Sequence, residues 1–267
     1  MTGSTISAAA LQFHISMDMS RNLETLERLL DPLPPHALAV APEGALSGYL
    51  PEPGFVERID VERSARAIAA VEARCRRKKI HVIAGACIKD DDGAWRNSSL
   101  YFGPNGERAR YDKINLAQSE RGTFVAGSAL PVFDVTVAGL PLRLGIQMCR
   151  EIRYPEQWRA LAVQGAQVFA YVNNAVGSKN GDALWRAHLV SRAAETQRFI
   201  VGANNAAPDQ TCPTAIIAPT GETLSTLPLG TEAAATASLD LGLVTDWVLS
   251  QARDDVVGVT LRKKPSD

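Results

Sequence analysis

Three residues whose side chains could catalyse hydrolysis stand at the ends of predicted structural elements. Cys149 closes an apolar, strand-like run and precedes the helical stretch that Pro155 opens. Glu43 follows a second apolar run, and Lys113 ends a third strand-like segment. A thiolate is a strong nucleophile, a carboxylate can take its proton, and an ammonium can stabilise developing negative charge. Together these residue types predict covalent catalysis by the thiol.

The segments around these residues resemble motifs of the nitrilase superfamily of carbon–nitrogen hydrolases. They read Pro-Glu-Gly-Ala-Leu-Ser-Gly-Tyr at 42–49, Tyr-Asp-Lys-Ile-Asn-Leu at 111–116 and Cys-Arg-Glu-Ile-Arg-Tyr-Pro-Glu at 149–156. That family has a glutamate, a lysine and a cysteine in the same chain order, and the resemblance covers roughly residues 5–245. Many members have an aromatic residue or Asn after the cysteine, whereas this chain has Arg150, and this departure bears on the substrate.

The resemblance implies the roles of the site residues. Cys149 would attack the substrate while Glu43 takes the thiol proton, passes it to departing ammonia and then activates water to hydrolyse the thioester. Lys113 and the backbone N–H of Arg150 are the candidates for stabilising the oxyanion. Family members often have a second glutamate after the lysine, which orients the lysine or the substrate, and Glu120 is the matching residue.

Several residues are candidates for binding the substrate. Asn173 and Asn174 lie just past the predicted strand 168–172, at the sheet edge where ligands gather, although a turn role is equally open. Arg150 could attract an anionic substrate, such as the amide of a dicarboxylic acid, if its side chain points inward. Amides, nitriles and N-carbamoyl compounds form related thiol adducts, so the three catalytic candidates do not choose among them. The chain lacks the Cys-Trp-Glu run associated with nitrile-cleaving members, which favours a linear amide.

Two other classes of protein remain as alternatives. A Cys-His hydrolase would need a histidine partner, and no motif ties Cys149 to any of the four histidines His14, His36, His81 and His188. A non-enzymatic small-molecule-binding or scaffold protein could retain a degenerate site. Taken singly, Cys149 reads as a packing residue, Glu43 as the partner of a surface arginine and Lys113 as an exposed cation. Their joint occurrence in family order favours the enzyme.

The elements that must position these residues alternate between strands and helices. We predict strands at 8–15 and 37–41, a helix that Asp18 or Ser20 caps, and a hairpin of 98–102 with 108–112. Residues 60–79 predict an amphipathic helix whose apolar positions are Val61, Ala65, Ile68, Ala69 and Val71. Asp182 is expected to cap a long helix through Gln197. This mixture indicates sheets covered by helices.

The family resemblance narrows that fold class to α/β with a four-layer α-β-β-α sandwich, in which two sheets pack face to face. It implies a single domain over residues 1–267, with a core of about 5–245 and a C-terminal tail of about 246–267. Family members usually pair through helices into an eight-layer dimer, so we expect a homodimer or higher homo-oligomer, and the tail could take part in that pairing.

Composition limits the partners. The 267 residues are 46% hydrophobic, enough for one large core, and 28 basic against 29 acidic side chains give a formal charge of -1. No overall field would therefore attract nucleic acid or an anionic membrane, and we expect a small-molecule substrate. The basic cluster 74–79 reads as the solvated end of a helix.

We infer the cellular compartment and the need for a cofactor from motifs that the sequence does not contain. No Lys or Arg precedes Arg21, so the start reads poorly as a signal peptide, and no apolar run approaches the roughly 20 residues that span a bilayer. We expect a cytoplasmic protein whose Cys75, Cys87 and Cys212 are reduced and mostly buried. Cys75 and Cys87 flank His81, but no second pair of residues follows with the spacing of metal ligands. No nucleotide-binding glycine loop is evident, and the proposed chemistry needs no cofactor.

Overall fold

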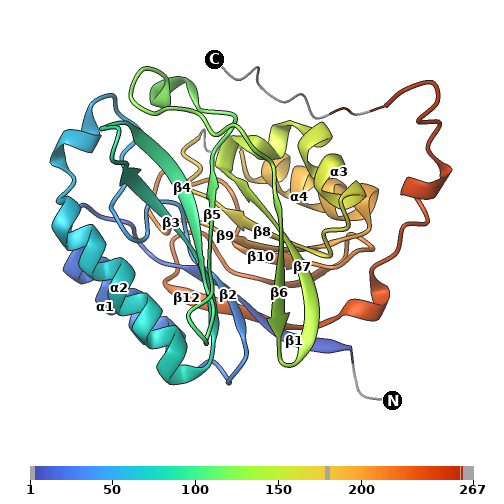
Figure 1. Ribbon diagram of the computed structural model, residues 1–267, viewed down its shortest axis with the longest axis horizontal. Helices are drawn as coiled ribbons and strands as arrows, with labels where there is room; N and C mark the ends of the chain where they lie inside the picture. Colours follow the sequence, from blue (N-terminus) through green and yellow to red (C-terminus); the bar gives the residue numbers. More distant parts are fainter. Residues whose placement is uncertain (1–3, 178–180, 259, 261–267) are drawn as a thin grey trace.

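The computed structural model describes residues 4–177, 181–258 and 260. Two six-stranded sheets pack face to face, with one pair of helices on the outer face of each sheet (Figure 1). The predicted four-layer α-β-β-α sandwich is therefore confirmed. The helices are α1 (Met19–Leu30) and α2 (Val61–Lys78) on one side, and α3 (Pro155–Val163) and α4 (Asp182–Thr196) on the other.

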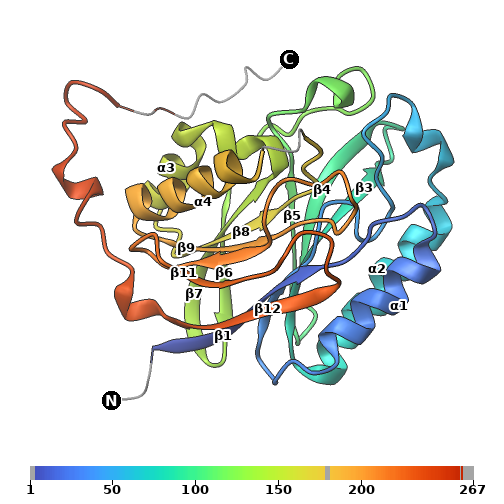
Figure 2. The same ribbon diagram turned by 180° about the vertical axis from the view of Figure 1, so that it is seen from behind.

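The chain fills one sheet mainly with its first half and the other with its second half. In spatial order, the first sheet contains β12 (Ala233–Asp240), β1 (Thr5–Gln12), β2 (Leu38–Val40), β3 (His81–Lys89), β4 (Trp95–Phe102) and β5 (Arg108–Asp112). The second contains β11 (Thr223–Thr226), β10 (Ala215–Ile217), β9 (Phe199–Ala203), β8 (Val168–Val172), β7 (Leu140–Met148) and β6 (Val132–Val137). The last strand returns to the first sheet, where β12 lies antiparallel to β1 at the edge (Figure 2).

The central strands are apolar throughout because they are buried on both faces. Successive side chains of a strand point to opposite sides of the sheet. In β1, Ala8 and Ala10 belong to the core that includes the space between the sheets, whereas Ala9 and Leu11 belong to the core beneath α1 and α2. Two cores thus account for the near-continuous hydrophobic runs that the sequence shows at the parallel strands.

Strand direction brings the catalytic candidates together. β2, β3 and β5 run the same way in the first sheet, and β7, β8 and β9 run parallel in the second. Glu43 follows β2, Lys113 follows β5 and Cys149 follows β7, so each lies at a carboxyl end. The N–H of Glu43 donates to the carbonyl of Asn173, just past β8, at 3.1 Å and links the ends of the two sheets.

The prediction for α2 was right in its extent and partly right in its buried face, since Val71 is buried and Ile68 packs against the core. Val61 is 48% exposed, and Ala65 and Ala69 are also exposed. The buried side instead comprises Ser64, Ala67, Val71, Glu72 and Cys75. Because most of these side chains are small or polar, hydrophobicity alone did not mark the inner face of this helix.

Two element ends also differ from the prediction. Residue 181, a glycine, is the N-cap of α4, and Asp182 is the first helical residue. At that position the helix dipole still stabilises its negative charge. β1 ends at Gln12, although the following Phe13 and Ile15 are buried like strand residues. Phe13 forms an isolated bridge with Asn205 instead, so the chain leaves the sheet while its side chains stay in the core.

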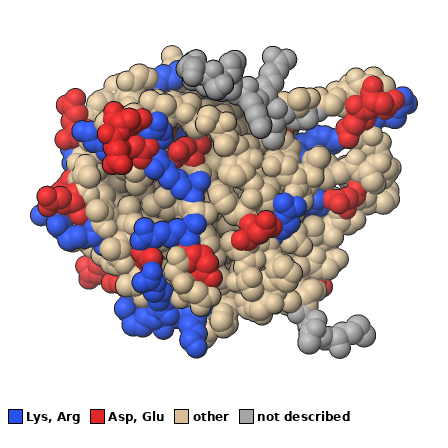
Figure 3. Space-filling view, in the orientation of Figure 1, with Lys and Arg blue, Asp and Glu red and all other residues tan. Residues whose placement is uncertain are grey.

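The basic cluster 74–79 is the end of a helix, as predicted. Arg76, Arg77 and Lys78 form the last turn of α2, and Lys79 caps it in the left-handed conformation. In Figure 3 a group of basic side chains lies at the lower edge of the molecule, where α2 ends. The helix dipole stabilises positive charge at a helix C-terminus, which explains why these side chains gather there. Among the helices of the described residues, none has the length and apolar character to cross a bilayer.

Candidate active site

Glu43 is fully buried at the end of β2 because β3 approaches it without a side chain. A Cβ at Gly85 would lie 2.5 Å from the Cα of Glu43 and 2.7 Å from the backbone nitrogen of Gly44. Real Cβ atoms essentially never show such contacts, so only glycine fits at this position of β3. The turn that follows uses Gly44 at φ 79°, a left-handed conformation that suits glycine.

Lys113 lies between two carboxylates. Its Nζ is 2.9 Å from Oε1 of Glu43 and 2.9 Å from Oε1 of Glu120, and all three side chains are buried. Their elements differ, since Lys113 follows β5 and Glu120 belongs to the short 3-10 helix Gln118–Glu120. The structure therefore brings together three of the four predicted catalytic residues. Buried charges persist only when they are paired and hydrogen-bonded, as these are.

The two carboxylates differ in their remaining partners. Glu120 accepts from the phenol of Tyr49 at 2.9 Å and from the N–H of Ala117 at 2.5 Å. Asn97 donates from Nδ2 to Oε1 of Glu43 at 2.7 Å and to Oε1 of Glu120 at 2.6 Å. Oε2 of Glu43 has no partner within the described part of the chain. Glu43 thus keeps one oxygen available for a proton.

Cys149 begins a short 3-10 helix, Cys149–Arg153, directly after β7. Its φ of 39° is positive, which is rare for a residue other than glycine and stores backbone strain. The phenol of Tyr171 donates to the Cys149 carbonyl oxygen at 2.6 Å and holds this conformation. The Sγ of Cys149 donates to the carbonyl oxygen of Asn174 at 3.7 Å. Because β7 ends at Met148, the predicted strand that reached Cys149 was one residue too long.

Glu151 connects the loop of Cys149 to the loop of Lys113. One of its oxygens accepts from the N–H of Met148 at 2.9 Å, which caps the 3-10 helix. The other accepts from the Tyr111 phenol at 2.7 Å and from the N–H groups of Ile114 and Asn115 at 2.9 and 3.0 Å. The Glu151 carboxylate therefore stabilises the start of this 3-10 helix and also fixes the segment after β5.

Burial and charge set the pKa values in opposite directions. Burial raises the pKa of Glu43, and the ammonium of Lys113 only partly opposes that rise. Burial also raises the pKa of Glu120, but Lys113 and the other donors more than offset it, so the net pKa is lowered. Burial disfavours the charge on Lys113, yet the Glu43 and Glu120 carboxylates help to raise its pKa well above the usual value. Burial and Glu43 raise the pKa of the Cys149 thiol, and Lys113 opposes that rise.

A cavity of about 190 Å³ opens onto Cys149. Its walls include Tyr49, Arg150, Arg153, Asn174 and Trp185. Arg150 lines the cavity, and its Nε donates to the Tyr154 phenol at 3.2 Å, so its predicted role in substrate binding stays a prediction. The guanidinium of Arg153 lies 5.7 Å from the centre of the Trp185 ring. Two cationic side chains consequently line a small cavity.

The two predicted asparagines have different surroundings. Asn173 is fully buried, and its carbonyl accepts from the N–H of Glu43. Asn174 lines the cavity, but its side-chain oxygen accepts from Asn205 at 3.1 Å and from Gln210 at 2.9 Å. Its side chain thus stabilises the loops beside the cavity, while its backbone oxygen contacts Cys149.

Sequence reasoning missed Asn97, Tyr49 and Tyr171. Asn97 had a usable signal, because asparagine is depleted in strands and this one lies in β4 beside Lys113. The N–H of Lys113 donates to the carbonyl of Asn97 at 2.9 Å, so the two residues are cross-strand neighbours. Tyr49 belongs to the same motif as Glu43, but nothing in its type predicted a contact with Glu120.

The carbon–nitrogen hydrolase family model matches residues 7–248. The chain belongs to the carbon–nitrogen hydrolase family. Among curated relatives, it is 29% identical to the human omega-amidase NIT2, over 80% of this chain and 81% of that protein. It is 30% identical to the deaminated glutathione amidase of Synechocystis sp., over 73% and 75% of the two chains. A crystal structure of an amidase from Nesterenkonia sp. superimposes with a TM-score of 0.81 at 21% identity and covers 96% of both chains.

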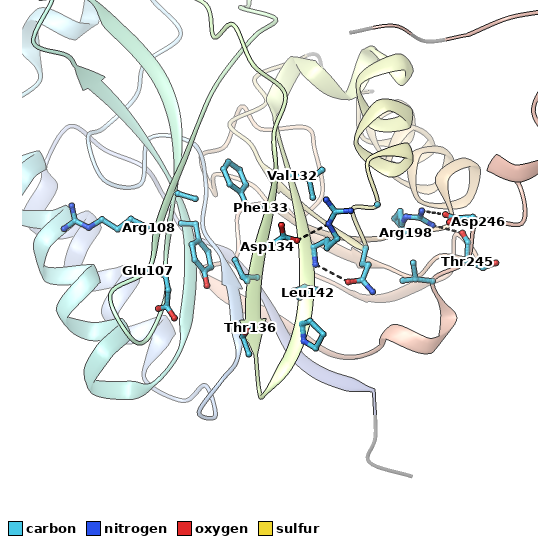
Figure 4. Close-up of a pocket in the computed structure, with 18 residues that line it drawn as sticks. Glu107, Arg108, Val132, Phe133, Asp134, Thr136, Leu142, Arg198, Thr245 and Asp246 are labelled. Atoms are coloured by element: carbon cyan, nitrogen blue, oxygen red, sulfur yellow. Dashed lines mark hydrogen bonds and ion pairs between the residues drawn. The ribbon is translucent and has the colours of Figure 1, made fainter. Parts of the chain in front are cut away.

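This hydrolase has a larger hollow elsewhere, of about 930 Å³, between the edge strands β5 and β6 and the segment 244–246 (Figure 4). Its charged side chains already have partners: Asp134 lies 3.0 Å from Arg143, and Arg198 pairs with Asp246. None of the predicted site residues lines it. Size therefore does not mark the site here, whereas the convergence of charged groups at Cys149 does.

Proposed function

We propose that this protein hydrolyses a small linear amide to a carboxylic acid and ammonia through a thioester on Cys149. The observation that carries the proposal is the buried Lys113 held between Glu43 and Glu120, beside a cavity that contains a thiol. The amidase relatives support this reaction, since the names of two of them specify amide cleavage.

In the first half-reaction the sulfur of Cys149 attacks the amide carbon while its proton moves to Oε2 of Glu43, the oxygen without a partner within the described part of the chain. The carbonyl oxygen becomes an oxyanion, which the Lys113 ammonium and the N–H of Arg150 stabilise. The intermediate then collapses, and the proton on Glu43 leaves with ammonia. A raised pKa suits Glu43 to hold that proton between the two events.

In the second half-reaction water attacks the thioester, and Glu43 takes its proton. The new tetrahedral intermediate expels the sulfur, which recovers the proton, and the acid departs. Glu120 remains a carboxylate throughout because its lowered pKa disfavours protonation. It thereby keeps the charge on Lys113 in place for both oxyanions.

The cavity favours a short substrate that bears a carboxylate. Its volume of about 190 Å³ is smaller than the roughly 300 Å³ at the lower end for drug-sized ligands. Arg150 and Arg153 both line it, and guanidinium groups bind carboxylates with paired hydrogen bonds. The monoamide of a small dicarboxylic acid satisfies both conditions.

Mass spectrometry of the intact protein tests the reaction. We expect incubation with succinamic acid to add a succinyl group to Cys149, and Cys149→Ala to abolish both the adduct and ammonia release. Ammonia release without any dependence on Cys149 would refute the mechanism. A wild-type protein that releases no ammonia from any member of an amide panel would refute the proposed function.

Substrate charge is tested by comparing succinamic acid with butyramide, a neutral amide of similar length. Arg150→Ala and Arg153→Ala are each expected to lower kcat/KM for succinamic acid roughly 10- to 100-fold, the range for a charged hydrogen bond, and to change butyramide little. Arg66→Ala, at an exposed position on α2, serves as the control. Equal losses for both substrates would contradict charge recognition.

A further inference from the structure

Asn97 occupies a position that no catalytic role yet explains. It lies in β4 next to Lys113, and the two residues share a backbone hydrogen bond of 2.9 Å. Asn97 is 1% exposed, so its side chain has exchanged water for protein contacts. A buried amide without partners would be costly, and its contacts therefore indicate what it stabilises.

The contacts of Asn97 join the two carboxylates. Nδ2 donates one hydrogen to Glu43 at 2.7 Å and the other to Glu120 at 2.6 Å. Only the nitrogen end of the amide can lie there, because an amide oxygen would face two carboxylate oxygens without a proton between them. The contacts therefore fix which way the amide points, and both of its hydrogens are used.

We propose that Asn97 is a positioning residue that fixes Glu43 so that Oε1 stays on Lys113 and Oε2 is left to accept the thiol proton. This inference rests on the proposed function, because it assigns Glu43 the role of general base. The other three donors to these carboxylates are Lys113, which binds both, and Tyr49 and the Ala117 N–H, which bind Glu120. Asn97 is thus the neutral side chain that holds Glu43.

Removal of this amide would leave Lys113 as the one remaining hydrogen-bond donor to Glu43 among the described side chains. The carboxylate could then rotate about its last side-chain bond, and either oxygen could meet the ammonium. Proton transfer from Cys149 needs a heavy-atom distance of about 2.6–3.2 Å, so this freedom lowers the fraction of productive geometries. It also removes a donor that favours the ionised form of Glu43.

The acid limb of the pH profile would move as a result. The titratable groups that act on Glu43, or on which it acts, are Lys113, Glu120, Cys149, Tyr49, Cys87 and Tyr171. All of these groups remain in an Asn97 variant. A change in the profile would therefore report on the missing amide.

Two variants and one control test the proposal. Asn97→Leu keeps the number and branching of the heavy side-chain atoms without a donor, and Asn97→Ala serves if the larger leucine does not allow folding. Ser99→Ala is the control, because Ser99 lies on the same face of the same strand and its hydroxyl has no partner among the described residues. Two readouts apply to each protein: kcat and KM for succinamic acid against pH, and the rate of Cys149 alkylation by iodoacetamide against pH.

For the Asn97 variants we expect kcat to fall roughly 10- to 100-fold with KM changed less than threefold, and both acid limbs to move up by about one pH unit. Ser99→Ala should match the wild type. Variants whose folded fraction is lower but whose profiles and kcat per titrated thiol equal the wild type would overturn the inference. The proposed function fails separately, if the wild type releases no ammonia, and the alkylation rates then still decide the role of Asn97.

Discussion

Gly85→Ala should inactivate this enzyme without touching a catalytic side chain. A Cβ at this position would lie 2.5 Å from the Cα of Glu43, whereas ordinary contact begins at 3.4 Å, so the two backbones must separate by about 0.9 Å. The nearest atoms are all backbone atoms of residues 42–44, and a flexible side chain cannot absorb the clash. A misplacement of about 1 Å at a catalytic group typically costs about 100-fold in rate.

We therefore expect kcat/KM of Gly85→Ala for succinamic acid to fall about 100-fold, measured by ammonia release. Overpacking of this kind costs about 1–3 kcal/mol, so the protein should still fold, which urea unfolding can check. Gly202→Ala in β9 is the matched control, since its Cβ would meet its nearest neighbour at 3.4 Å. Wild-type activity in a folded Gly85→Ala protein would refute the claim that this contact positions Glu43.

Two further substitutions address charge and stability. Lys113→Met should lower kcat roughly 100- to 1,000-fold through loss of an oxyanion donor, and single-turnover mass spectrometry should show slower formation of the Cys149 adduct; unchanged acylation would count against this role. Burial lowers the pKa of His81 from 6.5 to about 4, so its contribution to stability is complete above pH 6.5 and is lost as the pH falls towards 4. We expect this loss to be about 3 kcal/mol in urea unfolding between pH 7 and pH 4, and His81→Leu should lack that part of the pH dependence. Parallel pH curves for the two proteins would show that His81 does not couple to folding.

Hydrophobic runs and their ends made much of the active-site region predictable. Glu43 and Cys149 each follow a strand that is buried on both faces, and a polar residue at that point must lie at the end of a sheet. The chain order of these residues and Lys113 supplied the remaining information. Strand direction then brings Glu43 and Lys113 to one end of the first sheet and Cys149 to the carboxyl end of the second, and the hydrogen bond from Glu43 to Asn173 joins these ends.

The rest depends on contacts between segments that are distant in the chain. Nothing in the local pattern shows that Gly85 must make room for Glu43, because the clash arises only when β2 and β3 are adjacent. Val71 was predicted on the inner face of α2, but Ser64, Ala67 and Cys75 were missed because small or polar side chains carry little hydrophobic signal. A positive φ at Cys149 likewise has no signature in residue type.

The difference between the two glutamates suits the roles of base and fixed anion that the proposed mechanism gives them. Both lie 2.9 Å from Lys113, so the ammonium alone would not distinguish them. Tyr49 and the Ala117 N–H bind Glu120 and stabilise its ionised form, whereas Glu43 has a raised pKa and one oxygen without a partner among the residues that the structure describes. With two carboxylates and one ammonium already buried, a resting thiolate would add a second net negative charge to the site. The mechanism proposed above avoids that second charge, because the thiol passes its proton to Glu43 as it attacks and the charge moves on to the oxyanion beside Lys113.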